Sequence, residues 1–267
     1  MLRQPAVAGQ FYTDNPQRLR AELTRLIVPA ADKERPRGVI APHAGYMYSG
    51  SVAGELYGAV EVPATVIVLG PNHHGVGRRA ALSPATAWQT PLGDVPVNAR
   101  LATLVRQHTP LVEEDAAAHL YEHSLEVQVP FLQFVRPDVS IVPLCLGFGD
   151  YESCRELGEG LAAAIREYGD DVLIVASSDM THYESAAAAR RKDDRAIAAV
   201  MTLDPPGLLR VCREEAITMC GVVPATVMLV AALELGATTA RLVRYATSGD
   251  VTGDNRQVVA YAAFTVT

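Results

Sequence analysis

The chain has 267 residues, of which 49% are hydrophobic and 20% are charged, and its formal net charge is -7. This composition predicts one large globular domain spanning residues 1–267. Because the chain is acidic and its longest basic run is 190–192, we expect no nucleic-acid partner. We see no apolar segment long enough for a signal peptide or a membrane span, which favours a cytoplasmic protein without a membrane partner.

Helix and strand signals alternate along the whole chain. Asn15 followed by Pro16 predicts a helix N-cap and first helical residue, with Leu19, Leu23 and Leu26 at helical spacing behind them. Further helices are expected at 49–57, 98–107, 122–135, 151–168, 190–202 and 224–235. Strands are expected at 38–41, 65–69, 139–144, 172–176, 240–246 and 257–264. This alternation predicts an α/β fold with a central, mostly parallel or mixed sheet and helices on both faces.

Three of these strands run into residues of similar chemistry. Strand 38–41 leads to His43, strand 65–69 leads to His73 and His74, and strand 172–176 leads to Asp179 and His182. The carboxyl ends of parallel strands meet at one edge of a sheet, where ligands bind in open α/β folds. We therefore expect His43, His73, Asp179 and His182 to converge on one crevice, where imidazole and carboxylate groups hold a metal or transfer protons.

Each of these residues also has a purely structural interpretation. A single histidine at a strand end is more often a hydrogen-bonded structural residue than a ligand, but recurrence at successive strand ends favours a site. Successive side chains of an extended segment point to opposite faces, so only one of His73 and His74 is expected to face the crevice, and we choose His73. Asp179 and His182 have a spacing that suits a turn or a first helical turn, and a helix N-cap is an equal alternative for Asp179.

Cys220 stands between the charged segment 213–215 and an apolar helix. Cysteines in such positions are most often small buried hydrophobes, which is our expectation for Cys145, Cys154 and Cys212. No CxxC pair is present, so we expect no disulfide framework. Beside two histidines, however, the thiolate of Cys220 would complete a three-ligand site suited to iron, copper or zinc.

Six ordered segments of the chain resemble the motifs of the Memo family. They read PAVAGQFY at 5–12, APHAGY at 41–46, GPNHH at 70–74, EHSLE at 122–126, SSD at 177–179 with His182, and CG at 220–221. The match covers nearly the whole chain. The family in turn resembles the class III, protocatechuate-type extradiol dioxygenases, whose non-haem iron is held by two histidines and a glutamate. The resemblance therefore implies an extradiol-dioxygenase-like fold.

The resemblance also implies roles for individual residues. His43 and His73 would be metal ligands, and Cys220 would stand where the dioxygenases use a carboxylate. The implied metal is iron or copper, with zinc also possible, because a thiolate is a softer ligand than a carboxylate. His182 would be the catalytic acid or base, Asp179 would orient it or hydrogen-bond a bound water, and His123 would join them.

A metal-binding cysteine at the mouth of a crevice should have a depressed pKa. We therefore expect Cys220 to react readily with alkylating agents at neutral pH before metal binds, and to be shielded once metal is bound. The aromatic ring of Tyr46, which follows the His43 motif, either reaches a substrate or packs in the core.

Two classes of function remain open from the sequence. The first is a metal-dependent enzyme with redox or oxygenase-type chemistry on an unknown small substrate. The second is a non-catalytic protein that binds a ligand or peptide in the same crevice. Members of the family occur in genomes alongside a radical-SAM protein, which suggests a shared pathway.

A third and minor alternative is a zinc hydrolase. Residues 119–123 satisfy the H-x-x-E-H pattern of inverzincin metalloproteases, in which two histidines on one helix bind zinc and the glutamate is the base. The motif is short, and the sequence identifies no distant third ligand.

Overall fold

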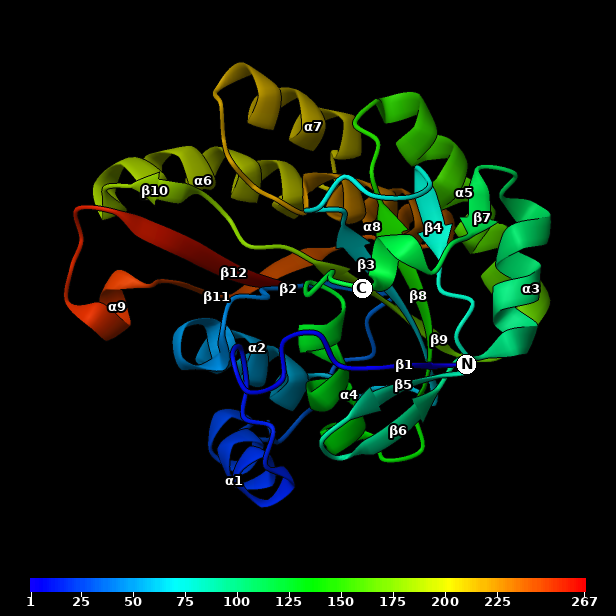
Figure 1. Cartoon of the computed structure of the whole chain (residues 1–267). Helices are drawn as coiled ribbons and strands as arrows, with labels where there is room; N and C mark the ends of the chain where they lie inside the picture. The colour runs from blue at the N-terminus through cyan, green and yellow to red at the C-terminus, as the bar shows by residue number, and fades with distance from the viewer.

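The computed structural model describes all residues from Met1 to Thr267, and a mixed nine-stranded β-sheet forms its centre (Figure 1). The strands of this sheet are β2 (Gly38–Ala41), β3 (Thr65–Pro71), β4 (Ala80–Leu82), β7 (Val112–Glu114), β8 (Ser140–Leu146), β9 (Val172–Ser177), β10 (His182–Glu184), β11 (Ala240–Thr247) and β12 (Val258–Val266). Their order is β10-β12-β2-β9-β3-β8-β4-β7, and β11 also pairs with β12. A smaller sheet has the order β1-β5-β6, formed by Leu2–Arg3, Ala87–Thr90 and Gly93–Pro96.

Helices cover both faces of the large sheet. One face packs against α3 (Ala99–His108), α5 (Tyr151–Tyr168), α6 (Ala186–Met201), α7 (Pro205–Glu214) and α8 (Val222–Glu234). The other face packs against α1 (Pro16–Leu26), α2 (Tyr46–Ala59) and α4 (Val129–Val135). Three short segments complete the structure: the 3₁₀ turns η1 (Ala117–His119) and η2 (Glu126–Gln128), and the helix α9 (Gly249–Thr252).

The central strands alternate between the two hydrophobic cores. In β3, Ile67 and Leu69 enter the core shared with α5 and α8, whereas Val66 and Val68 enter the core shared with α1 and α2. A strand that is buried on both sides needs apolar residues at every position, which explains why these strands appear in the sequence as continuous apolar runs. The predicted α/β class with helices on both faces is confirmed.

The three strands that carry the candidate residues are parallel neighbours. Strand β9 lies between β2 and β3, and its residue Ala176 pairs with Ile40 on one side and Leu69 on the other. Their carboxyl ends therefore lie side by side, as expected. The loops that follow them carry His43, His73 and the segment from Ser177 to His182 to one edge of the sheet.

Some sequence-based expectations for local structure are wrong. Helix 122–135 forms only from Val129, after the turn η2, because the backbone at 122–124 folds around the carboxylate of Glu122, which accepts from the Ser124 amide at 2.9 Å. Asp179 is not a helix N-cap, because strand β10 follows it and α6 is capped by Ser185. The short strands β1, β4, β5, β6, β7 and β10 were not expected, since runs of two to four residues carry too little periodicity. Helix α7 was also not expected, although it has ten residues and begins after the N-cap Asp204.

None of the helices combines the length and the apolar character that a membrane span requires.

Candidate metal centre

Three histidine side chains meet at the carboxyl edge of the sheet. One nitrogen each from His43, His73 and His123 lies within 4.8 Å of the other two. The rings of His73 and His123 stack with their centroids 4.7 Å apart, and the ring of His43 meets them edge-on at 5.3 and 5.4 Å. Histidine nitrogens gathered in this way are the usual donors for zinc, copper and iron.

Cys220 lies beside His43. Its Sγ atom is 3.2 Å from Nε2 of His43, and the backbone amide of Asp179 donates to the same sulfur at 3.3 Å. The next residue, Gly221, is the N-cap of α8, and a Cβ atom there would lie only 2.2 Å from the carbonyl oxygen of Ser177. Glycine thus permits the close approach that places Cys220 beside His43. The N-terminus of α8 also carries a partial positive charge that favours a thiolate once a metal has displaced the proton.

Glu122 holds His73 in place. Its carboxylate lies 2.8 Å from Nδ1 of His73 and accepts from the backbone amides of His73 at 2.8 Å and Ser124 at 2.9 Å. Burial alone would raise the pKa of Glu122, but the hydrogen bonds from His73 and Ser124 outweigh it and hold the pKa well below its ordinary value. The ionised carboxylate therefore fixes a proton on Nδ1 of His73 and leaves Nε2 free to bind a metal.

Glu122 is not among the site residues expected from the sequence. Glu122 was named in the EHSLE motif and in the competing H-x-x-E-H pattern, without a role at the metal position. The available signal was an acidic residue directly beside a histidine, at the start of a segment up to Val135 that is rich in Val, Leu and Phe. A carboxylate in such a segment is buried and needs a partner.

His43 and His123 are neutral in the metal-free protein. Burial lowers the pKa of His43 well below its ordinary value, and the neighbouring His123 and His73 lower it further. Burial also lowers the pKa of His123 to about 4. Because metal ions bind the neutral form of imidazole, these histidines release no protons on binding at neutral pH.

The expectation of an activated thiol at Cys220 is wrong for the metal-free protein. Burial raises the pKa of Cys220 above its ordinary value, and the nearby Asp179 raises it further. No cation lies beside the sulfur to offset these effects. The thiol is therefore protonated at neutral pH until a metal ion displaces the proton. The other three cysteines are buried and unpaired, as expected.

Asp179 and His182 lie beside the histidine cluster but do not bond to each other. Oδ1 of Asp179 accepts from the backbone amide of His43 at 2.8 Å, and burial raises the pKa of Asp179 to about 6. The Nδ1 atom of His182 lies 3.0 Å from the carbonyl oxygen of Thr218, which can only accept, so Nδ1 carries the proton and Nε2 is free to accept another. Thr218, rather than Asp179, orients His182.

Two further candidates have structural roles. Tyr46 is 2% exposed, and its hydroxyl donates to the carbonyl oxygen of Val127 at 2.9 Å, so it packs in the core. His74 is exposed, and its Nε2 lies 3.0 Å from the carbonyl oxygen of Tyr121. The choice of His73 over His74 therefore agrees with the geometry.

The H-x-x-E-H pattern does not form the helical ligand pair of an inverzincin. His119 is 1% exposed, and its Nε2 lies 3.0 Å from the carbonyl oxygen of Ala81, so it is not one of the clustered donors. Residues 119–123 cross the end of a 3₁₀ turn and irregular backbone rather than one helix. His119 thus helps to anchor this segment, while His123 alone joins the cluster.

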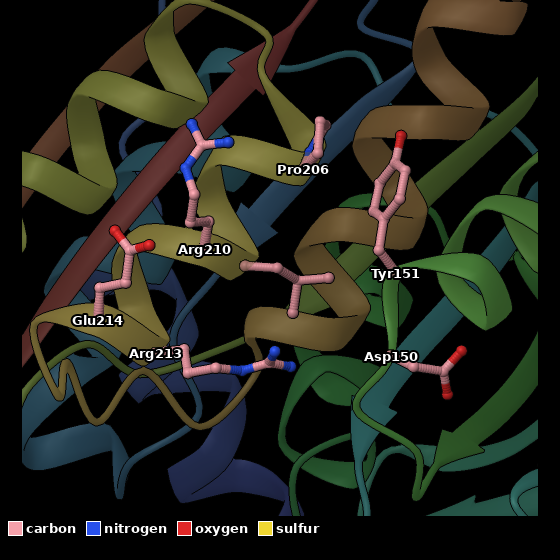
Figure 2. A pocket seen from close by; sticks show the side chains of 7 residues that line it. Asp150, Tyr151, Pro206, Arg210, Arg213 and Glu214 are labelled. Carbon is pink, nitrogen blue, oxygen red and sulfur yellow. The ribbon is translucent and has the colours of Figure 1, made fainter.

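A separate cavity of about 280 Å³ opens between α7 and the start of α5 (Figure 2). Arg210 and Glu214 extend from α7 on one side, and Asp150 and Tyr151 stand at the start of α5 on the other. This cavity contains none of the candidate site residues.

Comparisons with known proteins agree along the whole chain. The sequence model described as "Memo-like protein" matches residues 3–265. The MEMO1 family protein MTH_45 of Methanothermobacter thermautotrophicus is 42% identical over 98% of this chain and 99% of its own length. A MEMO1 family protein of Aquifex aeolicus is 44% identical over 97% of both chains.

One solved structure shows the same fold. The uncharacterized protein JW3007 from Escherichia coli K12 superposes with a TM-score of 0.54 at 14% identity, over 86% of this chain and 100% of that chain. At this identity the likeness concerns the fold alone.

Proposed function

This chain belongs to the Memo family, and we propose that His43, His73 and Cys220 bind a redox-active metal ion that serves the oxidation of a small substrate. The observation that carries the proposal is the convergence of three imidazole nitrogens within 4.8 Å, with the sulfur of Cys220 3.2 Å from His43. Donors that share one metal ion at about 2.0–2.3 Å each lie roughly 3–4.5 Å apart. The spacing of the three imidazole nitrogens therefore fits one metal ion after small side-chain movements, and Cys220 would join it from its contact with His43.

The site offers two sets of three ligands that share His43 and His73. His123 completes the set whose three donor atoms all lie within 4.8 Å of one another, and Cys220, which contacts His43, would complete the other. We favour Cys220, because its sulfur already lies beside Nε2 of His43 and at the N-terminus of α8. His123 then stands beside the position that faces the substrate.

The donor set favours iron or copper. Imidazole suits both metals, and a thiolate shifts preference toward copper or zinc. An iron or copper ion, when bound, supplies redox chemistry that no side chain of the site offers. Zinc would instead support hydrolysis, but residues 119–123 do not form the helical H-x-x-E-H ligand pair of an inverzincin.

The side chains of this chain would manage protons and exclude water. Nε2 of His182 is free to accept a substrate proton, and Asp179, with a pKa of about 6, gains or loses a proton near neutral pH. Phe11 packs on the ring of His123 with centroids 4.8 Å apart and covers that side of the cluster. The reaction would therefore take place in a site bordered by the apolar ring of Phe11 and by the proton-accepting side chains of His182 and Asp179.

A binding function in the same crevice is the second candidate, and one observation favours it. Met47, Tyr121 and Tyr183 are 66%, 67% and 73% exposed, and each lies within four residues of a histidine of the site. Exposed apolar side chains around a site are typical of contacts with a ligand or peptide. Such a protein would bind its ligand without turnover. The pathway link to a radical-SAM protein is part of this proposal for either candidate.

Metal analysis of protein purified without oxygen and without a chelating tag tests the proposed centre. We expect one equivalent of iron or copper in the wild type, and loss of the metal in His43→Ala, His73→Ala and Cys220→Ala. Cys154→Ala, which removes a buried thiol of the hydrophobic core, is the matched control and should retain the metal. Full metal occupancy in all three site variants would contradict the proposal.

A further inference from the structure

The hydroxyl group of Ser177 lies at the centre of a buried hydrogen-bond network behind His43. Its Oγ atom is 2.9 Å from Nδ1 of His43, 2.8 Å from Nε2 of Gln128 and 2.7 Å from the carbonyl oxygen of Ser124. The exposed fractions of Ser177, Gln128 and Ser124 are all 0%, and that of His43 is 2%. Solvent does not reach these polar atoms, so each of them must form its hydrogen bonds with other protein groups.

The orientation of the Gln128 amide is fixed by its neighbours. Its Nε2 lies 2.9 Å from the carbonyl oxygen of Pro42 and 3.3 Å from that of Ala41, and carbonyl oxygens can only accept. Its Oε1 accepts from the hydroxyl of the buried Tyr57 at 2.9 Å. The amide nitrogen must therefore face Ser177, and its second hydrogen is donated to the Ser177 hydroxyl.

The Ser177 hydroxyl has a single proton, and it donates this proton in a hydrogen bond to the carbonyl oxygen of Ser124 at 2.7 Å. One lone pair of the hydroxyl is used by Gln128, so only the other lone pair remains for His43. The ring nitrogen Nδ1 of His43 must then carry its own proton and donate it to Ser177. Nε2 of His43 is left as a lone pair that faces the sulfur of Cys220.

We propose that Ser177 and Gln128 are positioning residues that lock His43 in the tautomer with the proton on Nδ1, so that Nε2 faces the metal position before any metal binds. The consequence for metal affinity rests on the proposed function, whereas the tautomer itself does not. The opposite tautomer would have Ser177 donating to Nδ1, would leave the Ser124 carbonyl without that proton, and would point an N–H group at the ligand position. Buried carbonyl groups are rarely left without a donor.

The network differs from the one that orients His73. At His73 the ionised carboxylate of Glu122 accepts a hydrogen bond from the protonated Nδ1. At His43 the neutral hydroxyl of Ser177 accepts it, because the hydroxyl's own proton and its other lone pair are already used. Ser177 and Gln128 therefore act through His43 without contacting the metal position.

Nitrogen NMR of the metal-free, untagged protein tests this assignment. The protein would be labelled with ¹⁵N-histidine and studied at about pH 8, above the ordinary pKa of histidine, so that the imidazoles are neutral. His43→Gln identifies the His43 signals among those of the seven histidines. We expect long-range proton–nitrogen spectra to show Nδ1 of His43 protonated and Nε2 unprotonated.

Variants of Ser177 and of a control serine separate the role of Ser177 from general effects on folding. Ser177→Ala should leave His43 in a mixture of tautomers and weaken metal binding by roughly 10–100-fold, the usual scale for losing a partner of a metal ligand. Ser83→Ala is the matched control, because Ser83 is also buried but accepts from Nε1 of Trp88 at 3.0 Å, and it should change neither quantity. Ser177→Cys, which keeps the size but is a poorer acceptor, replaces Ser177→Ala if the alanine variant does not fold.

Two outcomes would overturn the inference. The first is a wild-type spectrum with the proton on Nε2 of His43. The second is a Ser177 variant in which the Nδ1 tautomer is unchanged. If the wild type instead binds no metal, the proposed function fails, while the tautomer measured in metal-free protein still stands or falls by itself.

Discussion

The Sγ atom of Cys220 and the Nε2 atom of His43 lie 3.2 Å apart, although 177 positions separate the two residues in the sequence. The contact joins the loop after β2 to the N-terminus of α8. In the metal-free protein the thiol of Cys220 is protonated and donates to Nε2, so a metal ion that binds here must replace this proton.

This contact predicts a spectroscopic signature of the thiolate. Adding Cu(II) or Co(II) to metal-free protein should produce a sulfur-to-metal charge-transfer absorption band, because the thiolate becomes a ligand. Cys220→Ser should abolish the band, and His123→Gln should retain it. Metal binding by the wild type without such a band would instead assign the third position to His123.

Glu122→Gln should weaken metal binding by roughly 10–100-fold. A neutral amide is a weaker acceptor than a carboxylate for the hydrogen bond from Nδ1 of His73. The carboxylate lies 2.8 Å from that nitrogen and is fully buried. Competition with a chelator of known affinity measures the change. Glu113→Gln, which alters an exposed carboxylate that pairs with Arg78, is the control and should have no effect. Equal metal affinities of Glu122→Gln and Glu113→Gln would show that Glu122 does not support metal binding.

Alkylation of Cys220 in metal-free protein should be slow at pH 7 and should accelerate continuously with pH. Only the thiolate reacts, and burial together with Asp179 raises the pKa of Cys220, so the reactive form is scarce at neutral pH. The rate should rise about tenfold per pH unit beyond about pH 8.5, where an ordinary thiol would level off. Mass mapping after brief treatment with iodoacetamide gives the rate at each pH. Rapid labelling with a plateau below pH 7 would show that the thiol is activated without metal.

His182→Ala should reduce turnover by roughly 100-fold or more while leaving the fold and the metal content largely intact, the usual scale for removing a positioned proton-transfer group. Asp179→Asn should have a similar effect, because the amide cannot take up the proton that a carboxylate with a pKa of about 6 exchanges. The measurement is oxygen consumption by iron- or copper-loaded protein with catechols, thiols and other reductants. Rates equal to that of free metal in the wild type and in both variants would favour the binding function.

The sequence predicted the parts of the site that sit at strand ends. Strands β2, β9 and β3 are recognisable as apolar runs, because both of their faces are buried, and parallel strands bring their following loops together. His43, His73, Asp179 and His182 could therefore be placed at one edge from local pattern alone. The choice between His73 and His74 followed from the alternation of side chains in extended backbone.

The tertiary structure decided the residues that come from irregular backbone. Glu122, His123 and Gln128 lie in a segment that local pattern predicted to be a helix, and contacts with distant residues hold it in another shape. Arg3 donates to the carbonyl oxygens of His119 and Glu122 and pairs with the buried Glu126. Such contacts join residues more than 110 positions apart, so no local periodicity reveals them. The protonation of Cys220 and the tautomer of His43 likewise depend on burial and on complete hydrogen-bond partners, which exist only once the chain has folded.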